Sequence, residues 1–275
     1  MSYDSAWSRS GPKACDRLFA AWSARGNPSP ALAWQRFHGA METGENALAR
    51  YLTRFMDAAT RADAELFLAV AGNPALVRDS ARFAPENPRH AQIVAFGLGR
   101  LATRDAGAAR AAFEQYARAG RIDPAALGGS AGRIASALAS DSARTALQWI
   151  LGLDARLRSD ALGEDAVRYA LREDGWDGAL AALDALPPHL AADERWAYWS
   201  ARSREARDGA DSREAYERLG ATRSYYGFLA ASRIGQDYSM QHQPAPVTEE
   251  LLRATEQHPG VLRAREFERL GQVLE

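Results

Sequence analysis

The sequence predicts an all-α fold, an α-solenoid (a superhelix of tetratricopeptide-like helical hairpins) that ends in a small helical domain. Alanine makes up about a fifth of the 275 residues, whereas isoleucine and valine are scarce. Ala, Leu, Arg and Glu favour helices and β-branched residues favour strands, so a sheet of three or more strands is not expected. Apolar residues recur at helical spacing between short breaks, and no segment could form a core alone.

The breaks give the order of the helices. Gly26-Asn27-Pro28 ends a first helix with Leu18, Phe19 and Trp22 on it, and Pro30 begins a second that stops before Gly44. Pro is tolerated in a first helical turn, so Pro74 and Pro88 indicate two further starts. The expected helices cover residues 15–25, 30–43, 47–59, 90–104, 106–119, 141–151 and 164–174, with a hinge at 104–105. The glycine-rich stretch 128–132 is interpreted as a plain loop, because neither a strand nor Gly-Lys-Ser makes it a phosphate loop.

The aromatic residues are densest between Trp176 and Tyr226. Trp176 lies on a helix that Pro187 ends, and Asp193 is the expected N-cap of the next helix. That helix carries Trp196 and Trp199, which could stack on sugar rings if exposed. Packing between helices is the favoured interpretation for both, because buried Trp supplies a large apolar area.

Charge and hydropathy exclude several classes of protein. Lys and Arg number 34 against 35 Asp and Glu, without a block of one sign, so nucleic acid is not an expected partner. Lys13 is the only lysine; an arginine-rich chain could recognise anions or glycans, but codon bias is the preferred explanation. No apolar run approaches the roughly 18 residues of a membrane span. The first residues also lack the pattern of a signal peptide, so the chain is expected to be cytosolic or exported with its leader removed.

Residues that could perform chemistry are scattered. The five histidines form no HExxH motif or i, i+4 pair, so neither a metal nor another cofactor is expected. Four pairs of adjacent acids occur, but nothing marks one of them as a catalytic pair, which needs a cleft and a raised pKa. The single cysteine, Cys15, permits no internal disulfide and is expected to be a buried thiol or to pair outside this chain. No catalytic residue is assigned.

Two stretches resemble a known family. The first stretch contains Trp176-Asp-Gly-Ala-Leu, Leu186-Pro and Trp196-Ala-Tyr-Trp. The second contains Ser224-Tyr-Tyr-Gly-Phe-Leu-Ala-Ala-Ser-Arg-Ile-Gly, followed by Tyr238. They are similar to the last helices of the superhelical domain, and the start of the linker domain, of soluble lytic murein transglycosylases. Residues 14–22, 33–34 and 44–46 resemble the middle of that superhelix, whereas between 60 and 160 only the helix spacing agrees.

The resemblance implies a periplasmic, peptidoglycan-cleaving parent enzyme whose lysozyme-like catalytic domain forms a 1,6-anhydromuramic product. The family's Glu-Ser, Gly-Leu-Met-Gln and Ala-Tyr-Asn motifs are missing, so the chain is expected to be inactive alone and trimmed at both ends. It would comprise a superhelical domain over residues 1–218 and a linker domain over 219–275. The resemblance also implies an upstream partner for Cys15 in the parent.

The expected function is therefore to position a peptidoglycan strand for the catalytic domain of the full-length protein. A set on the helix that follows Ser224 is expected to face that domain or the glycan: Tyr225, Tyr226, Phe228 and Arg233. Helical spacing predicts a buried stripe there, formed by Tyr226, Leu229, Ala230 and Ile234. The alternatives are a free-standing tetratricopeptide-like scaffold that binds proteins and, less favoured, an intact enzyme of unknown type.

Overall fold

The computed structural model describes residues 17, 21, 28–120, 122–209 and 211–271, and within these every regular element is a helix. The chain divides into two compact units, residues 1–212 and 213–275. The expected all-α class is confirmed. The first predicted helix and Cys15 lie almost wholly outside the described residues. The assignment of residues 219–275 to a linker domain stays a prediction.

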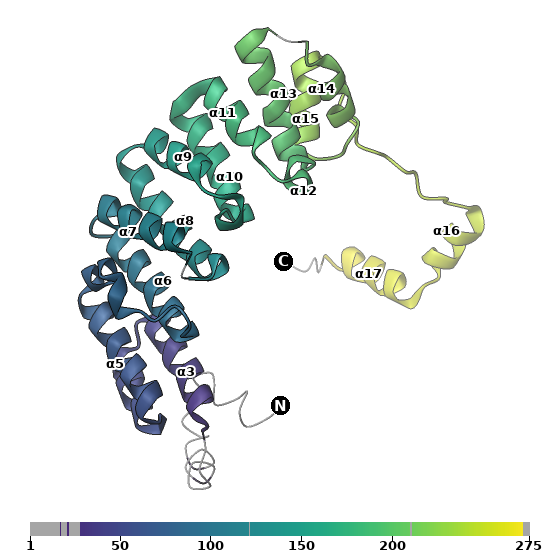
Figure 1. Ribbon diagram of the computed structural model, residues 1–275. Helices are drawn as coiled ribbons and strands as arrows, with labels where there is room; N and C mark the ends of the chain where they lie inside the picture. The colour runs from purple at the N-terminus through teal and green to yellow at the C-terminus, as the bar shows by residue number, and fades with distance from the viewer. Residues whose placement is uncertain (1–16, 18–20, 22–27, 121, 210, 272–275) are drawn as a thin grey trace. The chain divides into compact units, whose positions relative to one another are not determined.

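The helices of the first unit follow one another in chain order (Figure 1). They are α3 (Pro30–Thr43), α4 (Asn46–Leu52), α5 (Ala58–Gly72), α6 (Pro88–Ala102), α7 (Ala106–Ala119), α8 (Pro124–Asp141), α9 (Ala143–Gly152), α10 (Asp160–Tyr169), α11 (Gly175–Asp184), α12 (Pro188–Ala191) and α13 (Glu194–Asp208). Single turns of 3₁₀-helix lie between some of them: η2 (Thr53–Phe55), η3 (Pro74–Arg78), η4 (Ser80–Arg82) and η5 (Ala155–Leu157). A π-helical turn, η6 (Ala170–Asp174), joins α10 to α11.

Short polar side chains explain where most of these helices begin. Asp57, Asp105 and Asp193 each accept a hydrogen bond from a backbone N–H of the first turn of the helix that follows. Such a cap satisfies one of the four N–H groups that a helix start leaves unpaired. The predicted N-cap at Asp193 is therefore confirmed. At the other end, Gly44 closes α3 in the left-handed conformation, with φ of 78°, which glycine adopts without strain.

The core is continuous along the first unit. Its aromatic part lies between α3, α5 and α6, where Phe67 packs edge-on against Phe37 and Phe96 at ring-centroid distances of 5.6 and 4.7 Å. Trp34 joins them, and its Nε1 donates to Gln92 Oε1 at 2.7 Å. Each helix thus buries its apolar face on neighbours close in sequence, as expected for a solenoid of hairpins.

One buried carboxylate connects α5 to the start of α6. Asp63 is 8% exposed and accepts hydrogen bonds from Asn87 Nδ2, Arg89 Nη1 and His90 Nε2. His90 Nδ1 in turn accepts the N–H of Ala84 at 2.7 Å, which leaves the ring proton on Nε2 for Asp63. Burial alone would raise the pKa of Asp63, but these hydrogen bonds together lower it below its ordinary value. These bonds hold the start of α6 against α5.

The interpretation of residues 128–132 as a loop is wrong. The stretch lies inside α8, which starts at the Asp123 cap and Pro124. On this helix Leu127, Ala131 and Ile134 are buried against neighbouring helices. Burial of that face outweighs the low helix propensity of the glycines, about 1 kcal/mol each.

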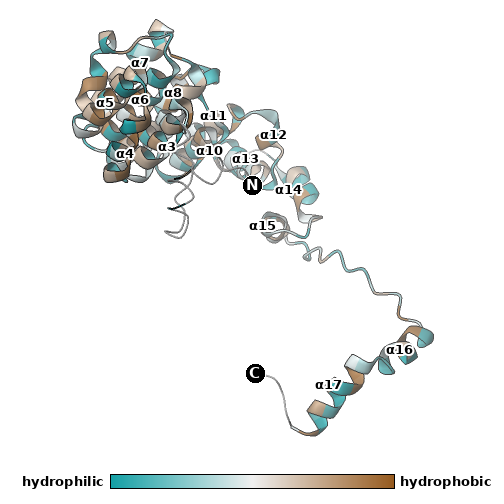
Figure 2. Ribbon diagram, turned by 90° about the horizontal axis from the view of Figure 1, so that it is seen from below, coloured by the Kyte–Doolittle hydropathy of each residue, from teal (hydrophilic) through white to brown (hydrophobic). Residues whose placement is uncertain are grey.

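The second unit contains α14 (Arg213–Gly220), α15 (Tyr225–Ile234), α16 (Glu249–Glu256) and α17 (Pro259–Arg269). α14 and α15 form a tightly packed hairpin that buries Tyr216, Leu219 and Ala230. Residues 236–247 have no regular structure, and no residue of α16 or α17 is buried. Figure 2 shows hydrophobic and hydrophilic residues interleaved along both of these helices.

Candidate functional site

The predicted site residues lie on α15. Ser224 caps this helix by accepting the N–H of Gly227, which places Tyr225 and Tyr226 in its first turn. Tyr225 is 69% exposed, and its ring meets that of Tyr226 edge-on at 5.1 Å. Tyr226 and Phe228 are half-buried and Arg233 is exposed. The structure thus brings the four residues together on one short helix, but it does not test their expected role.

The buried face of α15 differs from the predicted stripe. Ala230 is fully buried as expected, but the other fully buried positions are Gly227 and Ala231, and Tyr226 is only half-buried. A methyl group added to Gly220 of α14 would lie 3.4 Å from Cβ of Ala231, so the two helices pack at their small residues. Because large rings cannot enter so close a contact, the tyrosines remain at its edge.

Tyr238, which follows α15, extends this aromatic surface. Its ring lies 5.1 Å from that of Phe228, and its hydroxyl is 2.9 Å from Ser232 Oγ. Tyr238 is itself 55% exposed. The sequence motif contained this residue, but helical spacing could not assign it to the site because it lies beyond the end of the helix. We refer to Tyr225, Tyr226, Phe228 and Tyr238 as the aromatic surface.

The adjacent acids Glu164 and Asp165 are both engaged in ion pairs. Glu164 binds Arg168 at 2.7 Å and Arg195 at 2.8 Å, and it also accepts from Trp196 Nε1. Burial of Glu164 would raise its pKa, but Arg168, Trp196 and Arg195 lower it below the ordinary value. A general acid needs the opposite shift. Trp196 is 2% exposed, so the packing interpretation of this residue is confirmed.

In each remaining acid pair, one carboxylate has a partner on a helix. Glu173 accepts the backbone N–H of Ala143, and Asp193 caps α13. Glu249 is paired with Arg253 one turn further along α16. Among the described residues, no group of three or more His, Cys, Asp or Glu side chains could hold a metal ion.

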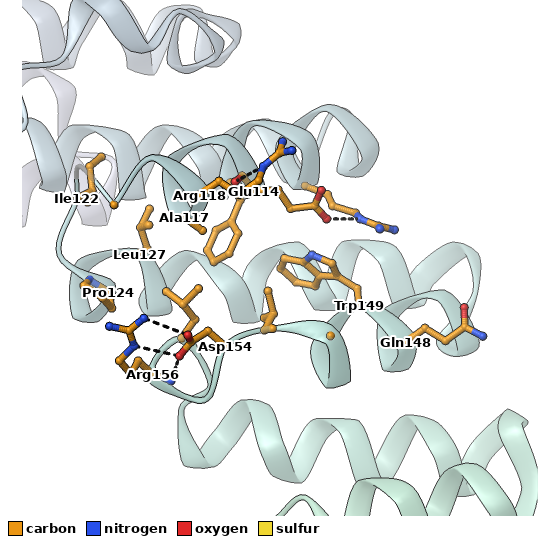
Figure 3. A pocket seen from close by; sticks show the side chains of 16 residues that line it. Glu114, Ala117, Arg118, Ile122, Pro124, Leu127, Gln148, Trp149, Asp154 and Arg156 are labelled. Atoms are coloured by element: carbon orange, nitrogen blue, oxygen red, sulfur yellow. Dashed lines mark hydrogen bonds and ion pairs between the residues drawn. The ribbon is translucent and has the colours of Figure 1, made fainter.

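One hollow of the first unit was not predicted from the sequence. It is a groove of about 600 Å³ in the first unit, between α7 on one side and α9 with η5 on the other. Figure 3 shows Trp149 near the centre of the view, with Leu127 and Ile122 to its left. The ring of Trp149 packs edge-on against Phe113 at 5.4 Å. We refer to this hollow as the α7–α9 groove.

Charged side chains line the rim of the groove. On α7, Arg110 Nε donates to Glu114 at 2.8 Å, and Arg118 Nε donates to the backbone oxygen of Glu114. On the opposite side Arg156 donates to both carboxylate oxygens of Asp154, at 3.1 and 3.0 Å (Figure 3). This two-point contact lowers the pKa of Asp154 to about 2.

Comparison with known proteins identifies relatives over almost the whole chain. No protein-family model matches the sequence. The soluble lytic murein transglycosylase of Escherichia coli K12 is 29% identical over 265 residues, and that of Salmonella typhimurium is 28% identical. Each alignment covers 94% of this chain and 40% of the relative.

Solved structures agree. The lytic transglycosylase Slt of Pseudomonas aeruginosa, crystallised as an inactive mutant, is 31% identical and superposes with a TM-score of 0.69. The 70-kDa soluble lytic transglycosylase of Escherichia coli is 28% identical and superposes with a TM-score of 0.72. Both superpositions cover 96% of this chain and 43% of the other.

The chain is homologous to part of a soluble lytic murein transglycosylase. It spans less than half the length of these lytic transglycosylases, and the family resemblance in the sequence motifs is confirmed. None of the described helices is long and apolar enough to cross a bilayer.

Proposed function

We propose that this chain is the non-catalytic superhelical scaffold of a periplasmic lytic transglycosylase and positions a peptidoglycan strand for a lysozyme-like catalytic domain of the full-length protein. The observation that carries the proposal is the homology, which extends over 94% of the chain to proteins named for their action on murein. The ion pairs of Glu164 support a non-catalytic role for this carboxylate, because they lower its pKa where a general acid needs a raised one.

The aromatic surface is the part of the chain that we propose faces the glycan. Tyr225 and Tyr238 expose most of their side chains, 69% and 55%, on or next to one helix. A flat ring exposed in this way can pack against the apolar C–H face of a sugar while its hydroxyl remains hydrated. The exposed Arg233 adds positive charge on the same helix, which suits the carboxylates of peptidoglycan peptides.

Co-sedimentation with purified peptidoglycan sacculi tests this proposal. We expect the 275-residue chain to pellet with sacculi, and we expect Tyr225→Ala together with Tyr238→Ala to weaken that binding about tenfold, as for the loss of two partly exposed aromatic contacts. Tyr51→Ala is the matched control, because Tyr51 is 52% exposed but lies on α4 in the first unit. It should bind as the wild type does.

Two results would count against the proposal. One is a wild-type chain that stays in the supernatant at all protein concentrations tested, and the other is equal binding by the double variant. Release of anhydromuropeptides from sacculi by this chain alone, above a buffer blank, would contradict its non-catalytic assignment.

A protein-binding role is a second candidate that one observation favours. α16, α17 and the residue that follows α17 expose several large apolar side chains: Leu251, Leu252, Leu262, Phe267 and Leu270. Two short helices that bury none of their apolar side chains are suited to a contact with another protein surface. The catalytic domain of the full-length protein would be one such surface. Leu262→Glu with Phe267→Glu should then weaken association with that domain when it is produced separately, and unchanged association would reject this role.

A further inference from the structure

The α7–α9 groove combines an apolar interior with a polar rim. Phe113, Leu127 and Trp149 are each at most 4% exposed, and Leu157 closes the side formed by η5. A volume of about 600 Å³ lies within the range of small-ligand sites, which are mostly apolar and carry a few polar groups that fix orientation. The groove lies wholly within the first unit, so it is separate from the aromatic surface.

The rim carries one more cation than anion. Arg110 is neutralised by Glu114, and Arg156 by Asp154. Arg118 has no carboxylate within ion-pairing distance among the described residues, and its Nε donates to the backbone oxygen of Glu114. Because an arginine has five N–H donors, its outer nitrogens remain able to bind a carboxylate in a two-point contact. The charge of the groove thus favours an anion.

A hydrogen-bond donor in the groove also lacks a partner. Trp149 is 4% exposed, and its indole Nε1 has no acceptor among the described residues. In Figure 3 the edge of the ring that carries this nitrogen is turned toward the side of α7 that holds Glu114. Burying a donor without an acceptor is unfavourable, and most such groups in proteins are paired. A ligand oxygen placed in the groove would supply the missing acceptor.

We propose that the α7–α9 groove binds the C-terminal residue of a peptide or protein, with a large apolar side chain in the groove and the terminal carboxylate on Arg118. Such a residue carries its side chain and its terminal carboxylate on one carbon atom, Cα, so both fit within one hollow of this size. A sugar fits less well, because Phe113 and Trp149 are buried and offer no open ring face. The proposal is independent of glycan binding by the aromatic surface.

The test uses N-acetyl-L-phenylalanine as the probe and its carboxamide as the neutral analogue. Binding to the 275-residue chain is followed by the indole N–H resonance of Trp149 in a two-dimensional NMR spectrum. The variant Trp149→Phe assigns that resonance among those of the seven tryptophans. For a probe of this size we expect a dissociation constant on the order of 1 mM. We expect the carboxamide to bind about three- to fivefold more weakly, as for the loss of an exposed ion pair.

Two variants locate the site. Arg118→Gln should weaken binding of the carboxylate about three- to fivefold and leave binding of the carboxamide unchanged. Gly152→Leu should abolish both, because Gly152 lines the groove and has no atom within 4 Å of an added Cβ. Gly72→Leu is its matched control: Gly72 also ends a helix, α5, with open space around it, but lies outside the groove. It should bind as the wild type does.

Several results would overturn the proposal. The first is a Trp149 resonance that does not move at a probe concentration 20-fold above the expected dissociation constant, about 20 mM. The second is equal binding of N-acetyl-L-phenylalanine and its carboxamide. The third is a shift of the resonance with N-acetylglucosamine oligomers but not with N-acetyl-L-phenylalanine. Equal loss in Gly152→Leu and Gly72→Leu would also reject the site. If Gly152→Leu does not fold by circular dichroism, Arg118→Gln and the carboxamide decide the question by themselves.

Discussion

Glycine to alanine substitutions on two helices of the first unit should change stability in opposite directions. Gly97 lies on α6 where this helix meets Val70 of α5 and Val77 of η3, both fully buried. A Cβ at position 97 would lie 2.6 Å from Val70 Cγ1 and would also collide with Val77. Carbon atoms pack at about 3.5–4.0 Å, and valine side chains have little rotamer freedom, so the helices would have to separate.

The expected magnitude is a balance of two effects. Overpacking of a core costs about 1–3 kcal/mol, and the overlap with two stiff valines places this site in the upper part of that range, about 2–3 kcal/mol, whereas replacing a helical glycine by alanine gains about 1 kcal/mol. Gly97→Ala should therefore destabilise the first unit by about 1–2 kcal/mol. Gly129→Ala on α8 is the matched control, because its added Cβ has no atom within 4 Å and the position is exposed. It should stabilise by about 0.5–1 kcal/mol.

Thermal and urea unfolding followed by far-UV circular dichroism measures both changes. A unit of this size shifts its midpoint by about 2–4 °C per kcal/mol, so Gly97→Ala should melt about 2–8 °C lower and Gly129→Ala about 1–4 °C higher. Since helical arrays can unfold in parts, amide exchange on α6 should be faster in Gly97→Ala than in wild type. A Gly97→Ala chain that melts at or above the wild-type temperature would show that the α5–α6 contact is looser than this packing implies.

Three further outcomes are expected. Because the pKa of Asp63 is lower in the folded state, its stabilising contribution should be complete above the unfolded pKa of about 3.9 and should decline as pH falls below that value. Urea midpoints measured between pH 6 and pH 2 should therefore fall less steeply for Asp63→Asn than for the wild type. Parallel profiles would contradict a lowered pKa at Asp63. Tyr116→Phe should lower the free energy of unfolding, measured by urea titration, by about 1 kcal/mol, because the buried hydroxyl of Tyr116 donates to the backbone oxygen of Val77 at 2.8 Å. An unchanged urea midpoint would mean that this hydrogen bond makes no net contribution to stability. Tyr225→Ala should change the melting temperature of the chain by less than about 1 °C, because the side chain is 69% exposed; a loss of about 3 kcal/mol would show that Tyr225 belongs to a core.

The aromatic surface shows which features of a site follow from local sequence. The helical spacing of the residues after Ser224 predicted a helix with a buried face, and the structure has this helix. Packing against α14 decides which side chains of α15 are buried. Because Gly220 of α14 contacts Ala231, the buried face of α15 is centred on Ala231 and not on Tyr226. Tyr238 joins the surface through a contact between a loop and a helix that no helical period describes.

What the sequence alone determined is the class of the fold and several helix starts, because a cap such as Asp193 acts on a backbone group two residues away. Two features were decided only by tertiary structure. Residues 128–132 are helical because α8 buries Leu127 and Ile134 on its neighbours, and local propensity does not report that free energy. The α7–α9 groove exists because Phe113 and Trp149, 36 positions apart, meet across helices whose spacing and rotation depend on packing along the whole row.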